Sequence, residues 1–169
     1  MNTSFSEFKQ QVRKGLFFSK FLFAKLPSAF FAGLKIDALD EMEATVSLKQ
    51  KWFNKNPFGS IYFAVLSMAA EMSTGILCMG NIYKRKPAVS MLVIEQRGLF
   101  HKKATGKILF TCTDGNRIST AIEESVATGK AVAITCYSKG TNSNNEMVAE
   151  FWVTWSFKLR NNKAMPLAG

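Results

Sequence analysis

A single carboxylate stands in the middle of a long apolar segment. Between Pro57 and Tyr83 the only charged side chain is that of Glu71, and its neighbours are apolar or small. A carboxylate in such surroundings is costly unless it is paired, hydrogen-bonded or protonated. The pattern therefore indicates either a structural hydrogen-bond hub or a catalytic acid or base. On these residues alone the two interpretations have equal weight.

Several other enzyme classes lack the residues that they require. His101 is the only histidine, and no GxSxG, phosphate-loop or dinucleotide-binding motif occurs. The cysteines Cys78, Cys112 and Cys136 are far apart, and their odd number favours neither a disulfide framework nor a zinc site. We therefore expect reduced cysteines, no bound metal and a cytoplasmic protein.

The beginning of the chain is rich in phenylalanine and predicts a helix. Ser4 and Glu7 have the spacing of a capping box, and Phe5, Phe8 and Val12 follow at helical intervals. Basic residues interrupt the apolar ones, a pattern that helices on a domain face show more often than helices on a membrane surface. We expect an N-terminal helical extension packed on the domain, with weak membrane-surface contact as the alternative.

The rest of the chain predicts one long helix among strands. Apolar and polar residues alternate strictly over residues 41–49, as in a strand with one solvated face. Ser60 is a suitable N-cap for the long apolar segment, and Glu71 at its centre favours a core helix over a membrane span. The other predicted elements are strands over residues 88–96, 107–113, 130–138 and 146–159, a short helix over residues 118–126 and a flexible tail over residues 161–169.

This order of elements predicts an α+β fold in which one antiparallel sheet wraps around one central helix. The residues that lead into the helix form a motif of Asn56, Gly59 and residues 60–64, followed seven residues later by Glu71. The motif resembles the hot-dog fold thioesterase superfamily, and in particular the phenylacetic-acid-degradation type of thioesterase. The resemblance implies an N-terminal extension over residues 1–33 and a hot-dog domain over residues 34–160, with a short inserted helix.

The resemblance also implies roles for four residues. Glu71 takes the place of the family's catalytic carboxylate, as general base or nucleophile, and Asn56 that of the asparagine that orients the thioester or the attacking water. The amide of Phe63 stands where a glycine amide is the oxyanion donor. Ser90 matches a serine that assists the site in some members. The sequence departs from the family pattern at residues 62–64, where Tyr-Phe-Ala replaces His-Gly-Gly.

The spacing of two of these residues adds a condition. Phe63 and Glu71 are eight residues apart, which corresponds to roughly 12 Å along one helix at ~1.5 Å per residue. Both cannot act on one carbonyl from that separation, so a working site needs a second subunit. The resembled family also has composite sites, and we expect a homodimer or a dimer of dimers.

The excess of basic residues indicates an anionic partner. A formal net charge of +10 attracts polyanions. The phosphates of coenzyme A, here part of the substrate and not a cofactor, suit Arg97, Lys102 and Lys103. The predicted function is hydrolysis of acyl-CoA or another acyl thioester, and the alternative is a hot-dog protein that binds acyl-CoA or a fatty acid without catalysis. Nucleic-acid binding is not expected, because the basic residues follow neither one helix nor an RNP motif.

Overall fold

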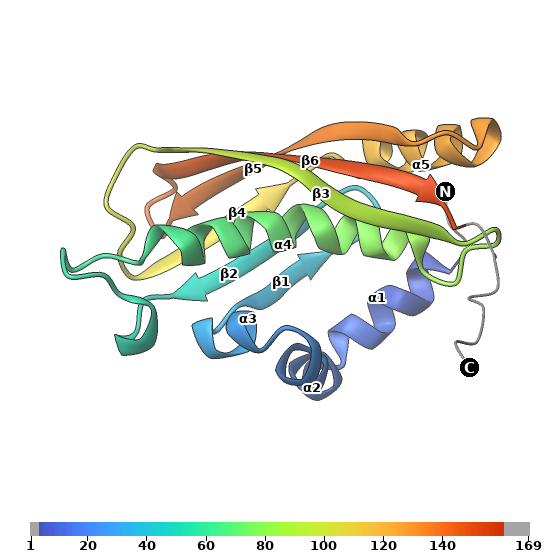
Figure 1. Ribbon diagram of the computed structural model, residues 1–169. Coiled ribbons are helices and arrows are strands. Elements are labelled where there is room, and N and C mark those ends of the chain that lie inside the picture. The colour runs from blue at the N-terminus through green and yellow to red at the C-terminus, as the bar shows by residue number, and fades with distance from the viewer. Residues whose placement is uncertain (1–3, 161–169) are drawn as a thin grey trace, which may run out of the picture.

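A computed structural model shows one antiparallel sheet wrapped around a single long helix (Figure 1). It describes residues 4–160, except for the side chains of residues 16 and 17. The strands follow the order β1-β2-β4-β5-β6-β3, and all neighbouring pairs are antiparallel. This is the predicted α+β arrangement. The elements are α1 (Phe5–Arg13), α2 (Gly15–Lys25), α3 (Pro27–Ala32), β1 (Lys35–Leu39), β2 (Ala44–Lys49), the short 3-10 helix η1 (Trp52–Asn54), α4 (Phe63–Ile82), β3 (Val89–Phe100), β4 (Lys107–Cys112), α5 (Gly115–Thr128), β5 (Val132–Asn142) and β6 (Met147–Leu159).

The central helix α4 is apolar on almost every side, and the fold covers it accordingly. Ala69, Ala70 and Leu77 are completely buried. Among the described residues α4 is the one helix whose length and composition could cross a bilayer, but 67% of its apolar stretch is buried inside the protein. A helix that is apolar all round and covered in this way is typical of a protein core.

The strand β6 shows how the sheet divides into an inner and an outer face. Phe151, Val153 and Trp155 are buried, whereas Trp152 and Thr154 between them are partly exposed. Successive side chains of a strand point to opposite faces, so this alternation separates the core side from the outer side. The alternation predicted for residues 146–159 is confirmed.

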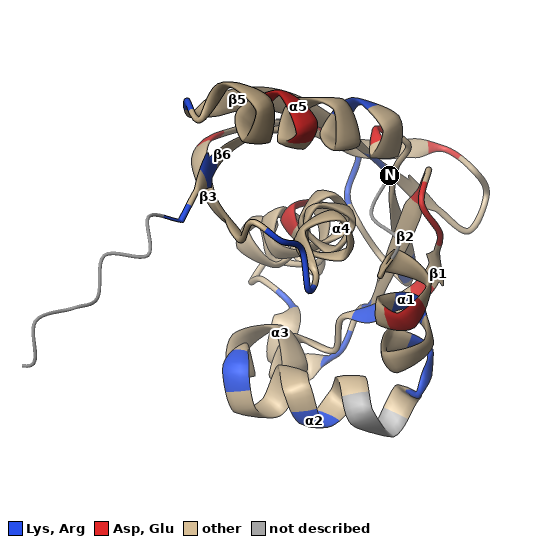
Figure 2. Ribbon diagram, turned by 90° about the vertical axis from the view of Figure 1, so that its right-hand side faces the viewer, with Lys and Arg blue, Asp and Glu red and all other residues tan. Residues whose placement is uncertain are grey.

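The N-terminal extension consists of three helices, so the prediction of a single one needs correction. Gly15 begins α2, and Pro27 occupies the first turn of α3, where its fixed φ is tolerated and a preceding helix ends. The apolar face of α1 is buried through Phe5, Phe8 and Val12. The three helices lie against α4 on the side that the sheet leaves open (Figures 1 and 2).

Some predicted boundaries also need correction. The strand predicted over residues 41–49 begins at Ala44, because Asp40 accepts hydrogen bonds from the amides of Met42 and Glu43 and turns the chain there. The strand β1 had no clear alternation and was not predicted. The strand β3 continues to Phe100, beyond the predicted residue 96. The predicted tail over residues 161–169 lies outside the described residues.

Thr74 holds the sheet to the central helix through a buried hydrogen bond, which can be tested. Its Oγ1 accepts from Nε1 of Trp155 at 2.8 Å and donates to the carbonyl of Glu71 at 2.9 Å. We expect Thr74→Val to lower the free energy of unfolding by about 1–3 kcal/mol, because it leaves the indole N–H unpaired in the core. The control Thr135→Val removes a hydroxyl from an exposed Thr135–Thr154 pair and should change stability by less than about 0.5 kcal/mol. Urea denaturation measures both, and equal losses would contradict this role of Thr74.

Candidate active site

Glu71 lies on α4 and faces a small apolar pocket. The pocket has a volume of about 60 Å³ and receives side chains from α2, α4, β3 and β6. Its lining residues are Phe18, Phe21, Leu26, Glu71, Met72, Gly75, Ile76, Met79, Met91 and Trp155. Within the described part of the chain no side chain forms a hydrogen bond or an ion pair with the Glu71 carboxylate. Burial raises the pKa of Glu71 above its usual value, because water is withdrawn from its charged form.

The absence of a partner bears on the two interpretations of Glu71. A structural hub would have hydrogen-bonded the carboxylate, with Asn56 or Ser67 as the expected partner. In the structure the side chain of Asn56 bonds to Ser60 instead, and among the described residues no hydrogen bond joins the Ser67 hydroxyl to Glu71. The geometry therefore favours a carboxylate that is available to a ligand.

A second apolar pocket adjoins that of Glu71. It has a volume of about 210 Å³ and lies between α4 and the helices α1 and α2. The two pockets share four lining residues, Phe18, Phe21, Ile76 and Met79. Glu71, Gln11 and Tyr83 are the polar side chains in otherwise mostly apolar walls, an arrangement typical of sites for a mostly apolar ligand. The N-terminal helices thus complete an apolar site that has Glu71 at one end.

Gly75 makes room for the carboxylate. A Cβ atom at this position would lie 3.0 Å from the ring of Trp155 and 3.3 Å from Oε1 of Glu71. Any larger residue would press on both neighbours. Gly75 and Trp155 were not predicted as site residues, because nothing in the linear sequence indicates that β6 crosses α4 at this level.

Asn56 organises the turn that leads into α4. Its Oδ1 accepts from the amides of Phe58 and Ser60 at 3.0 and 3.2 Å, and its Nδ2 donates to Oγ of Ser60 at 3.0 Å. Gly59 in this turn has φ +75°, which favours glycine. Asn56 and Phe63 line an open pocket of about 520 Å³ at the N-terminus of α4.

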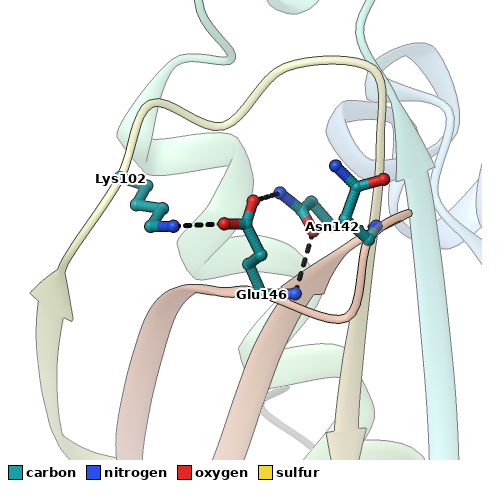
Figure 3. A network of polar contacts seen from close by, with 4 residues as sticks. Lys102, Asn142 and Glu146 are labelled. Carbon is teal, nitrogen blue, oxygen red and sulfur yellow. Dashed lines mark hydrogen bonds and ion pairs between the residues drawn. The ribbon is translucent and has the colours of Figure 1, made fainter.

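Two of the three predicted phosphate-binding residues lie at this open pocket. Lys102 forms an ion pair with Glu146, which also accepts a hydrogen bond from Asn142 at 2.8 Å (Figure 3). Lys103 donates to the carbonyl of Phe58 at 3.4 Å, and Lys55 lines the pocket as a further cation that the sequence analysis did not select. Lys55 and Lys103 make the open pocket electropositive, whereas Glu146 compensates the charge of Lys102.

Arg97 and Ser90 lie elsewhere. The guanidinium of Arg97 stacks 4.7 Å from the ring centroid of Trp152 on the outer face of the sheet. Ser90 on β3 donates to the carbonyl of Lys158 at 3.0 Å, and its neighbour Met91 lines the Glu71 pocket instead. Within one protomer the predicted site residues therefore form two groups, Glu71 on one side and Asn56 with Phe63 and the lysines at the end of α4.

The described residues contain neither a cluster of metal ligands nor an exposed thiol. Among residues 4–160 no group of three or more His, Cys, Asp or Glu side chains is placed to hold a metal ion. Cys78, Cys112 and Cys136 are free and buried. Burial raises the pKa of the Cys112 thiol to about 12, so the thiolate is disfavoured there.

The fold and this site can now be compared with known proteins. The family described as domain of unknown function (DUF4442) matches residues 15–156. The chain belongs to the DUF4442 family. The match spans α2, α3, α4 and nearly the whole sheet, so it includes α2 and α4, which line both pockets next to Glu71, but not α1. A comparison of this DUF4442 chain with curated proteins finds no match.

Solved structures share the fold of this DUF4442 protein. A protein of unknown function from Pseudomonas aeruginosa, called a probable thioesterase, is 21% identical with a TM-score of 0.72, over 85% of this chain and 95% of that one. A protein of unknown function from Chlorobaculum tepidum is 18% identical with a TM-score of 0.75, over 90% and 97% of the two chains. The thioesterase HI1161 from Haemophilus influenzae is 12% identical with a TM-score of 0.61, over 87% and 92%. The predicted hot-dog fold is confirmed.

The unpaired state of Glu71 predicts how stability depends on pH. Because burial raises the pKa of Glu71 in the folded protein, its contribution to stability is complete below the unfolded-state pKa and is lost as the pH rises through the folded-state pKa. Glutamine imitates the protonated form. We therefore expect Glu71→Gln to be more stable than the wild type at about pH 8 and equally stable at about pH 4.

Urea denaturation at the two pH values measures this difference. The control Glu124→Gln changes an exposed carboxylate on α5 and should leave the pH dependence of stability as it is in the wild type. A variant less stable than the wild type at high pH would show that the Glu71 carboxylate has a stabilising partner.

Proposed function

We propose that this protein hydrolyses acyl thioesters with Glu71 as the general base. The observation that carries the proposal is the unpaired Glu71 carboxylate at the end of an apolar site. The shared fold supports it, because structures with this fold include proteins named as thioesterases.

The reaction needs a base, a water molecule and an oxyanion donor. The raised pKa of Glu71 makes its carboxylate a stronger base toward water. Glu71 takes a proton as the water oxygen bonds to the thioester carbonyl carbon. The tetrahedral intermediate then collapses, the carbon–sulfur bond breaks, and the leaving thiolate receives the proton back from Glu71. The products are a carboxylic acid and a free thiol.

The backbone N–H of Phe63 is the proposed oxyanion donor. Phe63 is the first residue of α4, so its N–H has no acceptor within the helix, whereas the amides of Val65 and Leu66 donate to the carbonyl of Tyr62. The positive end of the helix dipole favours a developing oxyanion at this place. The side chain of Phe63 packs against Tyr62 and Phe100. The amide of Phe63 can therefore remain accessible even though phenylalanine replaces the family's glycine.

A second copy of the chain would bring this donor to Glu71. The strand β3 is an edge of the sheet, is 12 residues long and exposes Leu92 and Ile94. A long apolar edge is a template for pairing with another strand. Two-fold pairing of β3 with its copy would set the two α4 helices antiparallel, so that Phe63 of one protomer approaches Glu71 of the other. Met91 of β3 lines the Glu71 pocket, so this pocket lies next to the proposed interface.

The two groups of site residues suit the two parts of an acyl-CoA molecule. An acyl chain would occupy the adjoining apolar pockets beneath α1 and α2, where Met79 and Met72 give an adaptable lining. The coenzyme A phosphates would lie at the electropositive open pocket, near Lys55 and Lys103. Arg97 has no part in this arrangement, because it lies on the outer face.

Steady-state kinetics with several acyl-CoA substrates tests the base. We expect Glu71→Gln to lower kcat by about 100-fold or more, because general-base catalysis contributes on the order of 10²–10⁴-fold. Wild-type kcat/KM should rise with pH along a limb that lies above the ordinary pKa of glutamate, since only the deprotonated base is active and burial raises its pKa. The control Glu124→Gln should behave as the wild type. Binding of acyl-CoA without turnover by the wild type would identify the non-catalytic alternative.

Mixed dimers test whether the site is shared. Phe63→Pro removes the proposed donor, and proline is tolerated here because Phe63 is the first helical residue and Tyr62 has an extended conformation with ψ 135°. Phe63→Ala keeps the amide and is the control. Each of Phe63→Pro and Glu71→Gln should be inactive alone. An equal mixture refolded together should recover about a quarter of wild-type activity, because half of the dimers are mixed and each has one intact site. No recovery would mean that one protomer supplies both groups.

A further inference from the structure

Six exposed apolar side chains gather on the N-terminal helices and the neighbouring η1. Their exposed fractions range from 36% for Phe30 to 81% for Trp52. Isolated exposed apolar residues are ordinary, but a gathered patch marks a surface that meets another apolar phase. The six residues, here called the aromatic patch, are Phe23, Leu26, Phe30, Phe31, Trp52 and Phe53.

Ring contacts connect the aromatic patch across segments that are distant in sequence. The ring centroid of Phe23 lies 5.3 Å from that of Phe30 and 6.3 Å from that of Phe31. Phe31 in turn lies 6.0 Å from Phe53. The patch is therefore one continuous surface over α2, α3 and η1.

Buried hydrogen bonds hold these segments in place. Asn54 is 1% exposed, and its Nδ2 donates to the carbonyls of Ala32 and Lys49, at 3.0 Å in both cases. Its Oδ1 accepts from the amide of Lys51 at 2.9 Å. The aromatic patch is thus presented by a fixed framework, and its exposure does not come from a loose loop.

The charges around the aromatic patch have one sign. Residues 8–36 and 44–70 contain no aspartate or glutamate, and Figure 2 shows basic residues on α2 and no acidic residue on α2 or α3. Lys20, Lys25, Lys51 and Lys55 are exposed. The Nζ of Lys51 lies over Gly33 at the end of α3, 2.3 Å from where a Cβ would stand. Tryptophan and phenylalanine surrounded by lysines are typical of surfaces that insert into the headgroup region of anionic membranes.

We infer that the aromatic patch docks this protein on an anionic lipid bilayer. A second copy of the chain fits the aromatic patch less well, because contact between two such patches would bring the lysines of both copies together and these like charges would repel. This membrane contact does not involve α1, because the apolar face of α1 is buried. It therefore differs from the membrane contact through the first helix that the sequence allowed as an alternative. Leu26 belongs to both the aromatic patch and the Glu71 pocket. If the proposed hydrolysis is also correct, acyl substrates dissolved in the bilayer would enter next to the docked surface.

Vesicle binding tests the inference without any substrate. The chain should co-sediment with vesicles that contain phosphatidylglycerol and bind pure phosphatidylcholine vesicles at least about tenfold more weakly, because each lysine near an anionic surface adds favourable energy. High salt should weaken the binding. The emission of Trp52 should shift to shorter wavelength with anionic vesicles, and Trp52→Phe should lose most of that shift while it still binds.

Two double variants, each with a control substitution outside the aromatic patch, test whether this patch is the membrane-binding surface. Lys20→Glu combined with Lys25→Glu should weaken vesicle binding on the order of tenfold or more, whereas Lys158→Glu, an exposed lysine of β6, should have a much smaller effect. Phe31→Ser combined with Phe53→Ser should abolish most binding, whereas Met42→Ser, 43% exposed and outside the patch, should not. Circular dichroism checks that each variant is folded.

Three results would overturn the inference. The first is equal binding to both kinds of vesicle, and the second is unchanged vesicle binding by the patch variants. The third is that the combined Phe31→Ser and Phe53→Ser variant no longer dimerises but still binds vesicles. This third result would identify a second copy of the chain as the occupant of the aromatic patch. Hydrolysis of a short, soluble acyl-CoA in the absence of vesicles should be the same in the patch variants and the wild type. Failure of the proposed hydrolysis would leave the vesicle results unaffected.

Discussion

The constraint on which the whole structure depends is that α4 must be covered on every side. Its side chains are apolar almost all the way round, so no face can remain in water without a large loss of hydrophobic free energy. The sheet alone leaves one side of the helix open, and α1, α2 and α3 cover much of that side (Figure 1). Because those helices are short and meet α4 through bulky aromatic side chains, their packing leaves apolar pockets next to it.

Glu71 is partly buried on the side of α4 that the N-terminal helices cover. Leaving a carboxylate without a partner in such a place opposes folding, and an apolar residue would stabilise the protein better. The same burial gives the carboxylate the properties of a base, since its charged form is poorly solvated. Gly75 and Trp155 add a geometric condition, because the small residue leaves just the room that the carboxylate needs beside the indole. Stability and the proposed role as a base thus place opposite demands on this one position.

The edge of the sheet and the N-terminus of α4 both carry parts of the proposed site. The edge strand β3 is long and partly apolar, and it lies next to the Glu71 pocket. The N-terminus of α4 lies at an open pocket that is also lined by lysines. The helices that close the core turn further aromatic side chains outward. The same N-terminal segment therefore both shields α4 and shapes the outer surface.

The sequence by itself determined that α4 is a core helix, that β6 has an inner and an outer face, and that Glu71 is the unusual residue, because apolar periodicity and an isolated charge are local properties. Sequence resemblance also predicted the hot-dog fold. Only the tertiary structure decided that Glu71 has no side-chain partner among residues 4–160, that Asn56 serves its own turn, and that Arg97 stacks on Trp152 away from the lysines. It also decided that Gly15 and Pro27 divide the N-terminal extension into three helices, two of which carry the aromatic patch. These facts depend on which residues meet across the fold, and contacts between distant segments leave no periodic trace in a single chain.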